Sequence, residues 1–327
     1  MKFLSFDVLF KGLAMGIAEV IPGVSGGTIA FITGIYEKLM NTIRAINLEF
    51  FKDIKSGDWK KAFNTLDISF IVSLMVGMLL GIVFGIFVIS YLLIHFPEPL
   101  WGFFFGLIVA SALFIARQYN YKTLSALIAL LIGFVIAYGI TILSPVEGNY
   151  EYWFIFISGI VAISAMLLPG VSGSFMLVIL GLYGFILSSM KNLLTQFDSQ
   201  SLIIIGVFMS GLIIGAATFS RVFSWLFERY KHTTLAILTG FLLGSLNKIW
   251  PWKNVTQIYH KESGQFYNLV SIEELDKWDS AMIKIISEVP VWPQHYWGEP
   301  KSILTMVVCI LGFLVVFTMD FYKKGKI

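Results

Sequence analysis

A short segment that breaks helices occurs twice in this chain, each time inside a region that is otherwise apolar. The sequence IPGVSGG occupies residues 21–27, and LPGVSGS occupies residues 168–174. A break in lipid leaves backbone N–H and C=O groups without water, so it is tolerated only where protein or an aqueous cavity surrounds it. The repeated segment therefore predicts two buried interruptions of membrane helices that have a function.

The rest of the chain favours a polytopic membrane protein. Of its 327 residues 57% are apolar and 13% are charged, whereas about a quarter of the residues of a soluble domain are charged. The mean hydropathy is +0.82. The single cysteine, Cys309, excludes a disulfide framework. Apolar runs near the length of a membrane span are Asp67–His95, Leu100–Ala116, Thr123–Leu143, Ser201–Phe227, Thr233–Leu246 and Ser302–Met319.

Two further apolar regions, from about Val8 to Met40 and from about Tyr152 to Met190, each contain one of the breaks. In the first region, the stretch Ser25–Tyr36 is 12 residues long. At about 1.5 Å per residue it covers about half of the bilayer. Two half-length arms predict a re-entrant hairpin that leaves on the side it entered. The arm after the second break, Ser172–Met190, is longer and fits this description less well.

The sequence also contains an internal repeat. A shift that places Pro22 on Pro169 aligns residues 12–43 with 159–190, and a second shift aligns 89–111 with 223–245. We therefore predict one transmembrane domain, 1–327, made of a first repeat (1–143) and a second repeat (152–320). Each repeat is a re-entrant hairpin plus three transmembrane helices, and residues 248–300 form a polar insertion in the second repeat. The predicted fold class is an all-α polytopic membrane protein.

The orientation of the two repeats in the membrane follows from the number of crossings in each repeat and from the distribution of the basic residues. A hairpin followed by three crossings makes the two repeats inverted, whereas four crossings in each half would make them parallel. The hairpin arrangement puts the basic cluster at 44–61 and the basic tail at 323–326 on one side, and cytoplasmic loops are enriched in Lys and Arg. Both termini are then expected in the cytoplasm and the insertion outside.

Inverted repeats with broken helices are typical of transporters, whose substrate site lies at the breaks. Proline ends the incoming arm, glycine allows the turn, and serine can cap the outgoing helix. A helix start with bare N–H groups attracts phosphate or carboxylate. The alternative is a kink that serves packing only. The predicted substrate-binding residues are Pro22, Gly23, Val24, Ser25, Gly26, Gly27 and Thr28 of the first loop and Pro169, Gly170, Val171, Ser172, Gly173 and Ser174 of the second.

Three charged residues within or beside apolar segments complete the predicted site, because charge in a membrane is costly. Glu19 and Glu37 are expected to be coupling residues or charge partners, with a water-facing helix end as the alternative for Glu19 and an interfacial anchor for Glu37. Arg221 either binds a phosphate bidentately or extends its charged end to the membrane–water interface. No metal-ligand spacing, cofactor fingerprint or nucleic-acid motif is present, and proton or cation uptake is the expected form of coupling.

The segments GLAMGIAEVIPGVSGGTIAFITGIYEKL (12–39), PGVSGS (169–174) and GFLLGSLNKIWPW (240–252) resemble the polyprenyl-phosphate transporter family over nearly the whole chain. This resemblance implies a non-enzymatic flippase of the bacterial plasma membrane. Its substrate would be undecaprenyl phosphate, returned from the outer to the inner leaflet so that the carrier lipid is recycled for peptidoglycan and other envelope polymers. Glu19, residues 22–28, Tyr36 and Glu37 fall on the first signature.

Two other functions remain open at this point. Undecaprenyl-pyrophosphate phosphatases also use re-entrant helices with a Pro-Gly-x-Ser loop, but they place an arginine after the serine, where this chain has Gly26 and Gly173. A secondary transporter of a small soluble anion would use the same loops. A groove open to lipid would favour the lipid substrate, and a closed central cavity would favour the soluble one.

Overall fold

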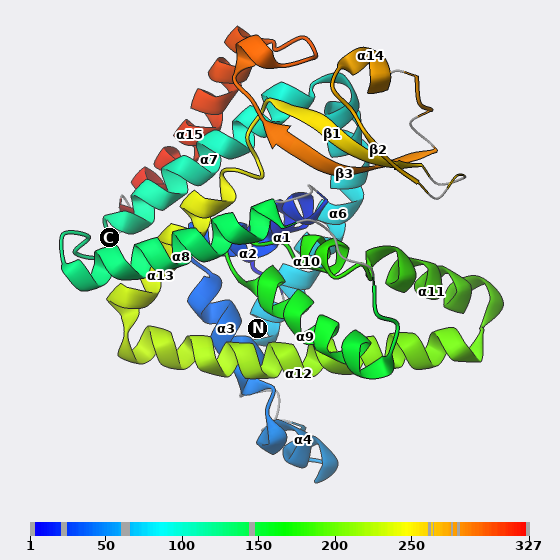
Figure 1. The fold of residues 1–327 in the computed structure, drawn as a ribbon. Helices are drawn as coiled ribbons and strands as arrows, with labels where there is room; N and C mark the ends of the chain where they lie inside the picture. Colours follow the sequence, from blue (N-terminus) through cyan, green and yellow to red (C-terminus); the bar gives the residue numbers. More distant parts are fainter. Residues whose placement is uncertain are drawn as a thin grey trace.

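The computed structural model of this chain describes residues 4–20, 25–59, 66–143, 148–260, 263, 265–275, 277–279 and 282–324, and it is mostly helical (Figure 1). The first half contains α1 (Phe6–Glu19), α2 (Gly26–Ile32), α3 (Tyr36–Ala45), α4 (Leu48–Lys55), α6 (Ile68–His95), α7 (Pro97–Ala116) and α8 (Leu124–Ile142). The second half contains α9 (Tyr152–Leu167), α10 (Gly173–Ile179), α11 (Tyr183–Gln196), α12 (Ser199–Arg229), α13 (Lys231–Ser245) and α15 (Ser302–Lys324).

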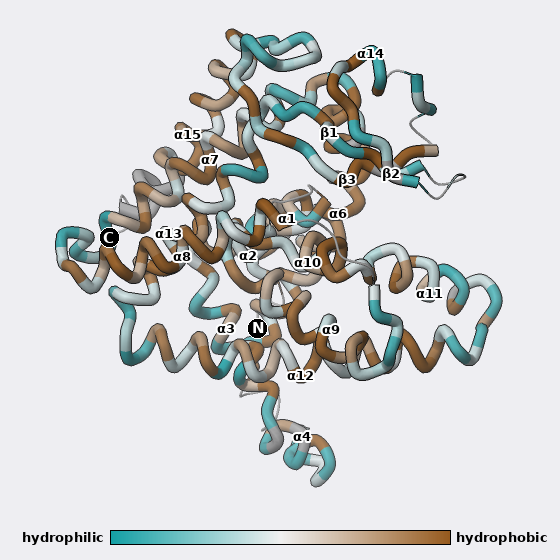
Figure 2. The backbone as a smooth tube through the Cα atoms, in the orientation of Figure 1, coloured by the Kyte–Doolittle hydropathy of each residue, from teal (hydrophilic) through white to brown (hydrophobic). Residues whose placement is uncertain are grey.

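Four of the described helices are long and apolar enough to cross a membrane: α6, α7, α8 and α12. They confirm four of the six expected spans and make the chain a multi-pass membrane protein. The other two expected spans do not reach the length of a candidate span, since α13 has 15 residues and the apolar part of α15 is Ser302–Thr318. Figure 2 shows hydrophobic residues along these long helices and more hydrophilic residues on α4 and on the part between α13 and α15.

Four helix pairs make the most extensive helix contacts: α1 with α6, α9 with α12, α7 with α15, and α8 with α13. Small residues let backbones approach closely where lipid provides no hydrophobic drive for helix association. Each pair has a glycine against a backbone carbonyl of its partner: Gly77 against Leu9, Gly211 against Phe156, Gly106 against Cys309, and Gly240 against Leu130. The helix pairing therefore depends on the absence of a side chain at these positions.

We expect Gly77→Leu to destabilise the protein, because any Cβ at this position would collide with the Leu9 carbonyl and separate α1 from α6. Overpacking of this kind costs about 1–3 kcal/mol or more. The measurement is the fraction that stays monodisperse in detergent after heating. Gly206→Leu is the matched control, since a Cβ at Gly206 of α12 meets nothing within 4 Å. Equal thermal tolerance of the two variants would contradict this account of the pairing.

The insertion between α13 and α15 is built around a β-sheet, and in this part of the chain the expected all-α fold is wrong. It forms an antiparallel sheet with strand order β2-β1-β3, made of β1 (Lys253–His260), β2 (Gln265–Asn268) and β3 (Ile283–Pro290), and a short helix α14 (Ile272–Leu275). Ile258 of β1 is fully buried and pairs with both outer strands. The strands are short and mixed in polarity, so their pairing depends on contacts between distant parts of the insertion.

Buried polar contacts hold the insertion to the helices. The hydroxyl of Tyr296 donates to Glu98 at the start of α7 (2.9 Å), and Lys301 forms an ion pair with the same carboxylate (3.5 Å). The Trp250 indole donates to Val291 O, and the Trp252 indole donates to Pro300 O, both at 2.8 Å. Tyr296 and Lys301 thus attach the insertion to α7, whereas the two indole hydrogen bonds join the beginning of the insertion to its end.

Candidate functional site

The described part of the first loop begins at Ser25, which caps α2. Ser25 has an extended backbone, and its Oγ accepts a hydrogen bond from Gly27 N at 3.1 Å. Pro22, Gly23 and Val24 lie outside the described residues. The predicted capping role of Ser25 is confirmed, and it satisfies one of the N–H groups that a helix start leaves without a partner.

The second loop starts α10 in the same way. Ser172 is the capping residue, and its Oγ lies 3.5 Å from Phe175 N and 2.9 Å from Ser174 Oγ. Gly170 has a φ of +86°, a conformation that glycine adopts without steric cost, and so the turn after Pro169 needs this residue. Val171 and Ser172 are buried beside it.

The two loops lie against each other although they are far apart in the sequence. Ser25 Oγ donates to Met166 O at 2.8 Å, and Gly170 N donates to Thr28 Oγ1 at 2.9 Å. Ser25 is 1% exposed and Thr28 is fully buried. A Cβ at Gly27 would lie 2.8 Å from Met166 O. The predicted meeting of the loops is therefore present, and glycine at position 27 permits it.

The helices after the loops end in matching turns. Gly34 and Gly181 both have positive φ, 73° and 70°. Ile35 N donates to Ala30 O, and Leu182 N donates to Leu177 O, each at 2.9 Å. This is the hydrogen bond of a Schellman C-cap. α10 and α11 are bent by 109°, so the expected long arm Ser172–Met190 is two helices, and the exit of the second loop resembles that of the first.

The two helix starts differ in what occupies their N–H groups. Glu19 Oε1 accepts from Gly26 N at 2.8 Å, so a carboxylate of the protein itself occupies the start of α2. At the start of α10, Gly173 N and Ser174 N have no acceptor among the described residues. The expectation of bare amides therefore fits the second loop, whereas the first loop already holds an anionic group.

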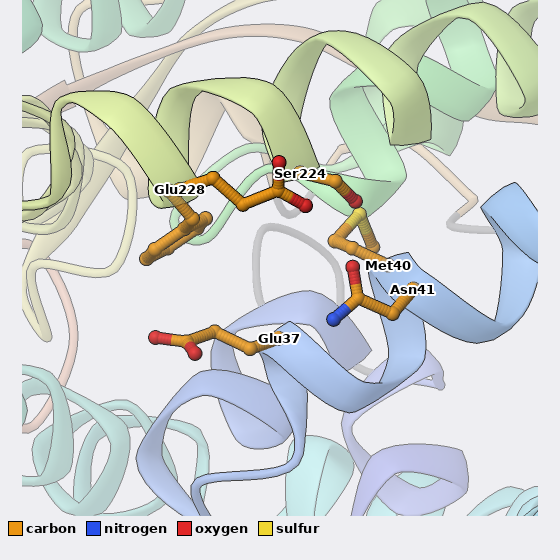
Figure 3. A pocket seen from close by; sticks show the side chains of 6 residues that line it. Glu37, Met40, Asn41, Ser224 and Glu228 are labelled. Atoms are coloured by element: carbon orange, nitrogen blue, oxygen red, sulfur yellow. The ribbon is translucent and has the colours of Figure 1, made fainter.

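Glu37 lies away from the loops, in a cleft of about 90 Å³ between α3 and α12. Figure 3 shows Glu37 and Asn41 of α3 facing Ser224 and Glu228 of α12 across this cleft. Glu37 forms an ion pair with Lys231 at 3.0 Å, and Glu228 forms one with Arg44 at 2.7 Å. These two ion pairs join α3 to the second half of the chain.

Arg221 has an exposed side chain on α12, and none of the described contacts joins it to either loop. Its neighbour Ser220 is the residue that faces the interior. In this conformation the loops and Arg221 are therefore not brought together, and the snorkelling alternative is compatible with its exposure.

An apolar groove of about 670 Å³ lies next to the first loop and was not expected from the sequence. Its walls carry almost no polar surface, and it is open on one side rather than enclosed. It is lined by Ala14, Ile17, Ala18, Ile29, Ile89, Leu92, Phe96, Pro99, Leu100, Phe103, Phe104, Leu107, Leu304, Val308 and Val315. These residues come from α1, α2, α6, α7 and α15, so no local sequence pattern could reveal the groove.

The arrangement combines two kinds of environment. The loops place the hydroxyl groups of Ser25 and Ser172 in the protein interior, where polar groups gain from binding a charged partner. The exposed Ser174 lies beside them, and Gly173 N and Ser174 N have no acceptor among the described residues. The adjoining groove offers hydrocarbon surface only. A molecule with an anionic head and a long apolar tail has the chemistry to use both.

The comparisons with known proteins agree with this chemistry. The family model described as "VCA0040-like: Undecaprenyl phosphate translocase-like" matches residues 15–267. A Vibrio cholerae protein named polyprenyl-phosphate transporter is 44% identical over 265 residues, which cover 81% of this chain and 83% of that protein. A Staphylococcus aureus protein of the same name is 30% identical over 258 residues, covering 74% and 85%.

No solved structure is significantly similar to the chain. The relatives are named as transporters and not as enzymes. The resemblance carried by the two loops and the GFLLGSLNKIWPW segment is thereby confirmed, and the chain belongs to the undecaprenyl phosphate translocase-like family.

Proposed function

We propose that this protein is a flippase that moves undecaprenyl phosphate from the outer to the inner leaflet of a bacterial plasma membrane, and so returns the carrier lipid for peptidoglycan and other envelope synthesis. The phosphate binds at the two loops, chiefly at Ser172, Gly173 and Ser174, while the polyprenyl chain lies in the apolar groove. The relatives named polyprenyl-phosphate transporters support the substrate class.

The observation that carries the proposal is the position of the groove. Ile17 and Ala18 of α1 and Ile29 of α2 line it, and these residues flank Glu19 and Ser25 of the first loop in the sequence. A soluble anion has no use for an open, almost wholly apolar groove of about 670 Å³. A lipid phosphate needs such a surface, because its tail stays apolar while its head crosses the membrane.

The repeat supports a symmetric transport cycle. By their order in the two repeats, α1 corresponds to α9, α6 to α12, α7 to α13 and α8 to α15. Exchanging each helix for its equivalent converts the pair α1–α6 into α9–α12, and the pair α7–α15 into α13–α8. In our proposal the halves are inverted, each hairpin re-enters from its own side, both termini are cytoplasmic and the sheet is outside. The states would alternate as one half rocks against the other around the joined loops.

Filling the groove tests the proposal. Val308→Trp places an indole among the groove-lining side chains of α15, and we expect transport to fall about 10-fold because the tail loses its place. The measurement is transfer of labelled undecaprenyl phosphate between leaflets of proteoliposomes. Val307→Trp is the control, since Val307 is its exposed neighbour on the same helix and is not part of the groove.

Equal transport by the Val308 and Val307 variants would remove the groove from the mechanism. Transport of inorganic phosphate, with no movement of the lipid, would favour the soluble-anion transporter instead. Release of phosphate from undecaprenyl pyrophosphate would revive the phosphatase.

A further inference from the structure

The GFLLGSLNKIWPW segment contains a lysine that the proposed site does not yet use. Lys248 lies in the turn after α13, and its Nζ sits 4.7 Å from the ring centre of Phe175 in the first turn of α10. Phe175 directly follows Ser174 of the second loop. A cationic group is thereby held next to the loop in which Gly173 N and Ser174 N have no acceptor among the described residues.

The position of this turn is fixed from several sides. Asn247 Nδ2 donates to Thr141 Oγ1 of α8 at 2.7 Å, and Ile249 is fully buried. Trp250 is held through its indole by Val291 O, and Lys253 Nζ donates to Lys248 O at 3.2 Å. The backbone of Lys248 is therefore anchored next to the second loop.

Two lysines in this region share one carboxylate. Lys253 Nζ lies 3.3 Å and Lys248 Nζ 3.8 Å from Glu288 Oε2. The Lys253 side chain is 9% exposed and also lies over the Trp101 ring at 4.5 Å. Two positive charges against one negative charge leave a surplus of one positive charge. A surplus charge in a largely buried place is costly unless an anion joins it.

Lys248 is the less satisfied of the two. Its ion pair with Glu288 is the longer one, and 28% of its side chain is still exposed. Burial lowers the pKa of its ammonium group below the usual range, which Glu288 only partly offsets and Lys253 reinforces. A phosphate beside Lys248 would offset the cost of burying its charged ammonium group. Lysine binds phosphate as a point charge.

We infer that Lys248 is a substrate-binding residue, which takes the phosphate of the lipid on the sheet side of the molecule and passes it to the second loop. Glu288 holds the ammonium group in place while the site is empty and competes with the phosphate for it. In the proposed topology this side is extracytoplasmic, so Lys248 acts at the start of transport. The inference rests on the proposed function and adds an entry step to it.

The test is a comparison of two substitutions with opposite expected signs. Lys248→Gln keeps a polar side chain, one atom shorter, but loses its charge, and we expect the KM for lipid phosphate to rise about 10-fold with little change in the maximal rate. Lys248→Arg restores the charge and most of the affinity. Glu288→Gln removes the competitor and lowers the KM. Lys191→Gln, on the exposed surface of α11, serves as the matched control.

Binding of farnesyl phosphate and farnesol to the purified protein supplies a second readout. The Lys248→Gln variant should lose affinity for farnesyl phosphate and keep its affinity for farnesol, which has no phosphate. A merely structural salt bridge would make Lys248→Gln and Glu288→Gln lose activity alike, and that result overturns the inference. If wild-type protein moves no lipid phosphate, the proposed function fails; if it does and Lys248→Gln has an unchanged KM, only the entry step fails.

Discussion

Replacing Gly27 with leucine is expected to reduce lipid-phosphate transport about 100-fold, because the two loops then cannot meet. A Cβ at this position would lie 2.8 Å from Met166 O and 3.0 Å from Leu167 O, and both atoms belong to the backbone at the end of α9. The same carbonyl of Met166 accepts the hydrogen bond of Ser25 Oγ. A larger side chain therefore forces the first loop away from the second.

The measurement is the flip rate in proteoliposomes at equal amounts of folded protein. Gly139→Leu on α8 is the matched control, since a Cβ there meets nothing within 4 Å. We expect this control to transport at the wild-type rate. Wild-type transport by Gly27→Leu would show that contact between the loops is not needed, and the phosphate site proposed here would have to be abandoned.

Glu19→Gln is expected to lower transport at least about 10-fold and to make the remaining rate insensitive to a proton gradient. The Glu19 carboxylate accepts a hydrogen bond from Gly26 N, and an anionic head group could also bind this amide. Glu19 has no ion-pair partner among the described residues. Protonation would remove its negative charge and let the phosphate approach. Glutamine keeps the shape and an acceptor oxygen but cannot take up or release a proton.

The measurement is transport with and without an imposed pH difference across the proteoliposome membrane. Asp7→Asn on the same helix is the control, because Asp7 is exposed and its ion pair among the described residues is a local one with Lys11 at 2.6 Å. We expect the control to keep the response of the wild-type protein. A full response to the gradient in Glu19→Gln would rule out Glu19 as the proton carrier, and a fall in rate alone would leave it as an anchor of the first loop.

Much of the local structure could be predicted from the sequence. The long apolar runs became α6, α7, α8 and α12, because length and hydrophobicity decide whether a helix can span a bilayer. Ser25 and Ser172 cap helices because a serine side chain can satisfy an N–H group two or three residues further on. The helix breaks between Glu19 and Gly26 and between Leu167 and Gly173 rest on equally local chemistry.

Two features of the second half could not be predicted from segment length or hydropathy alone. The arm Ser172–Met190 looks long enough to cross, but the positive φ of Gly181 divides it into α10 and α11. The polar insertion lacks an apolar period, and its sheet forms only when β1 meets both β2 and β3. Glycines at 34 and 181 occupy equivalent places in the repeat, and this equivalence was the available signal for the second break.

The sequence by itself determined where helices start, where they break, and which stretches belong in lipid, since these properties depend on residues within a few positions of one another. The tertiary structure alone decided that Glu19 accepts the hydrogen bond of Gly26 N, that Lys248 lies over Phe175, and that five helices line an open apolar groove. Those features depend on the distances between groups up to about 300 positions apart, and such distances are set by helix packing rather than by any local pattern.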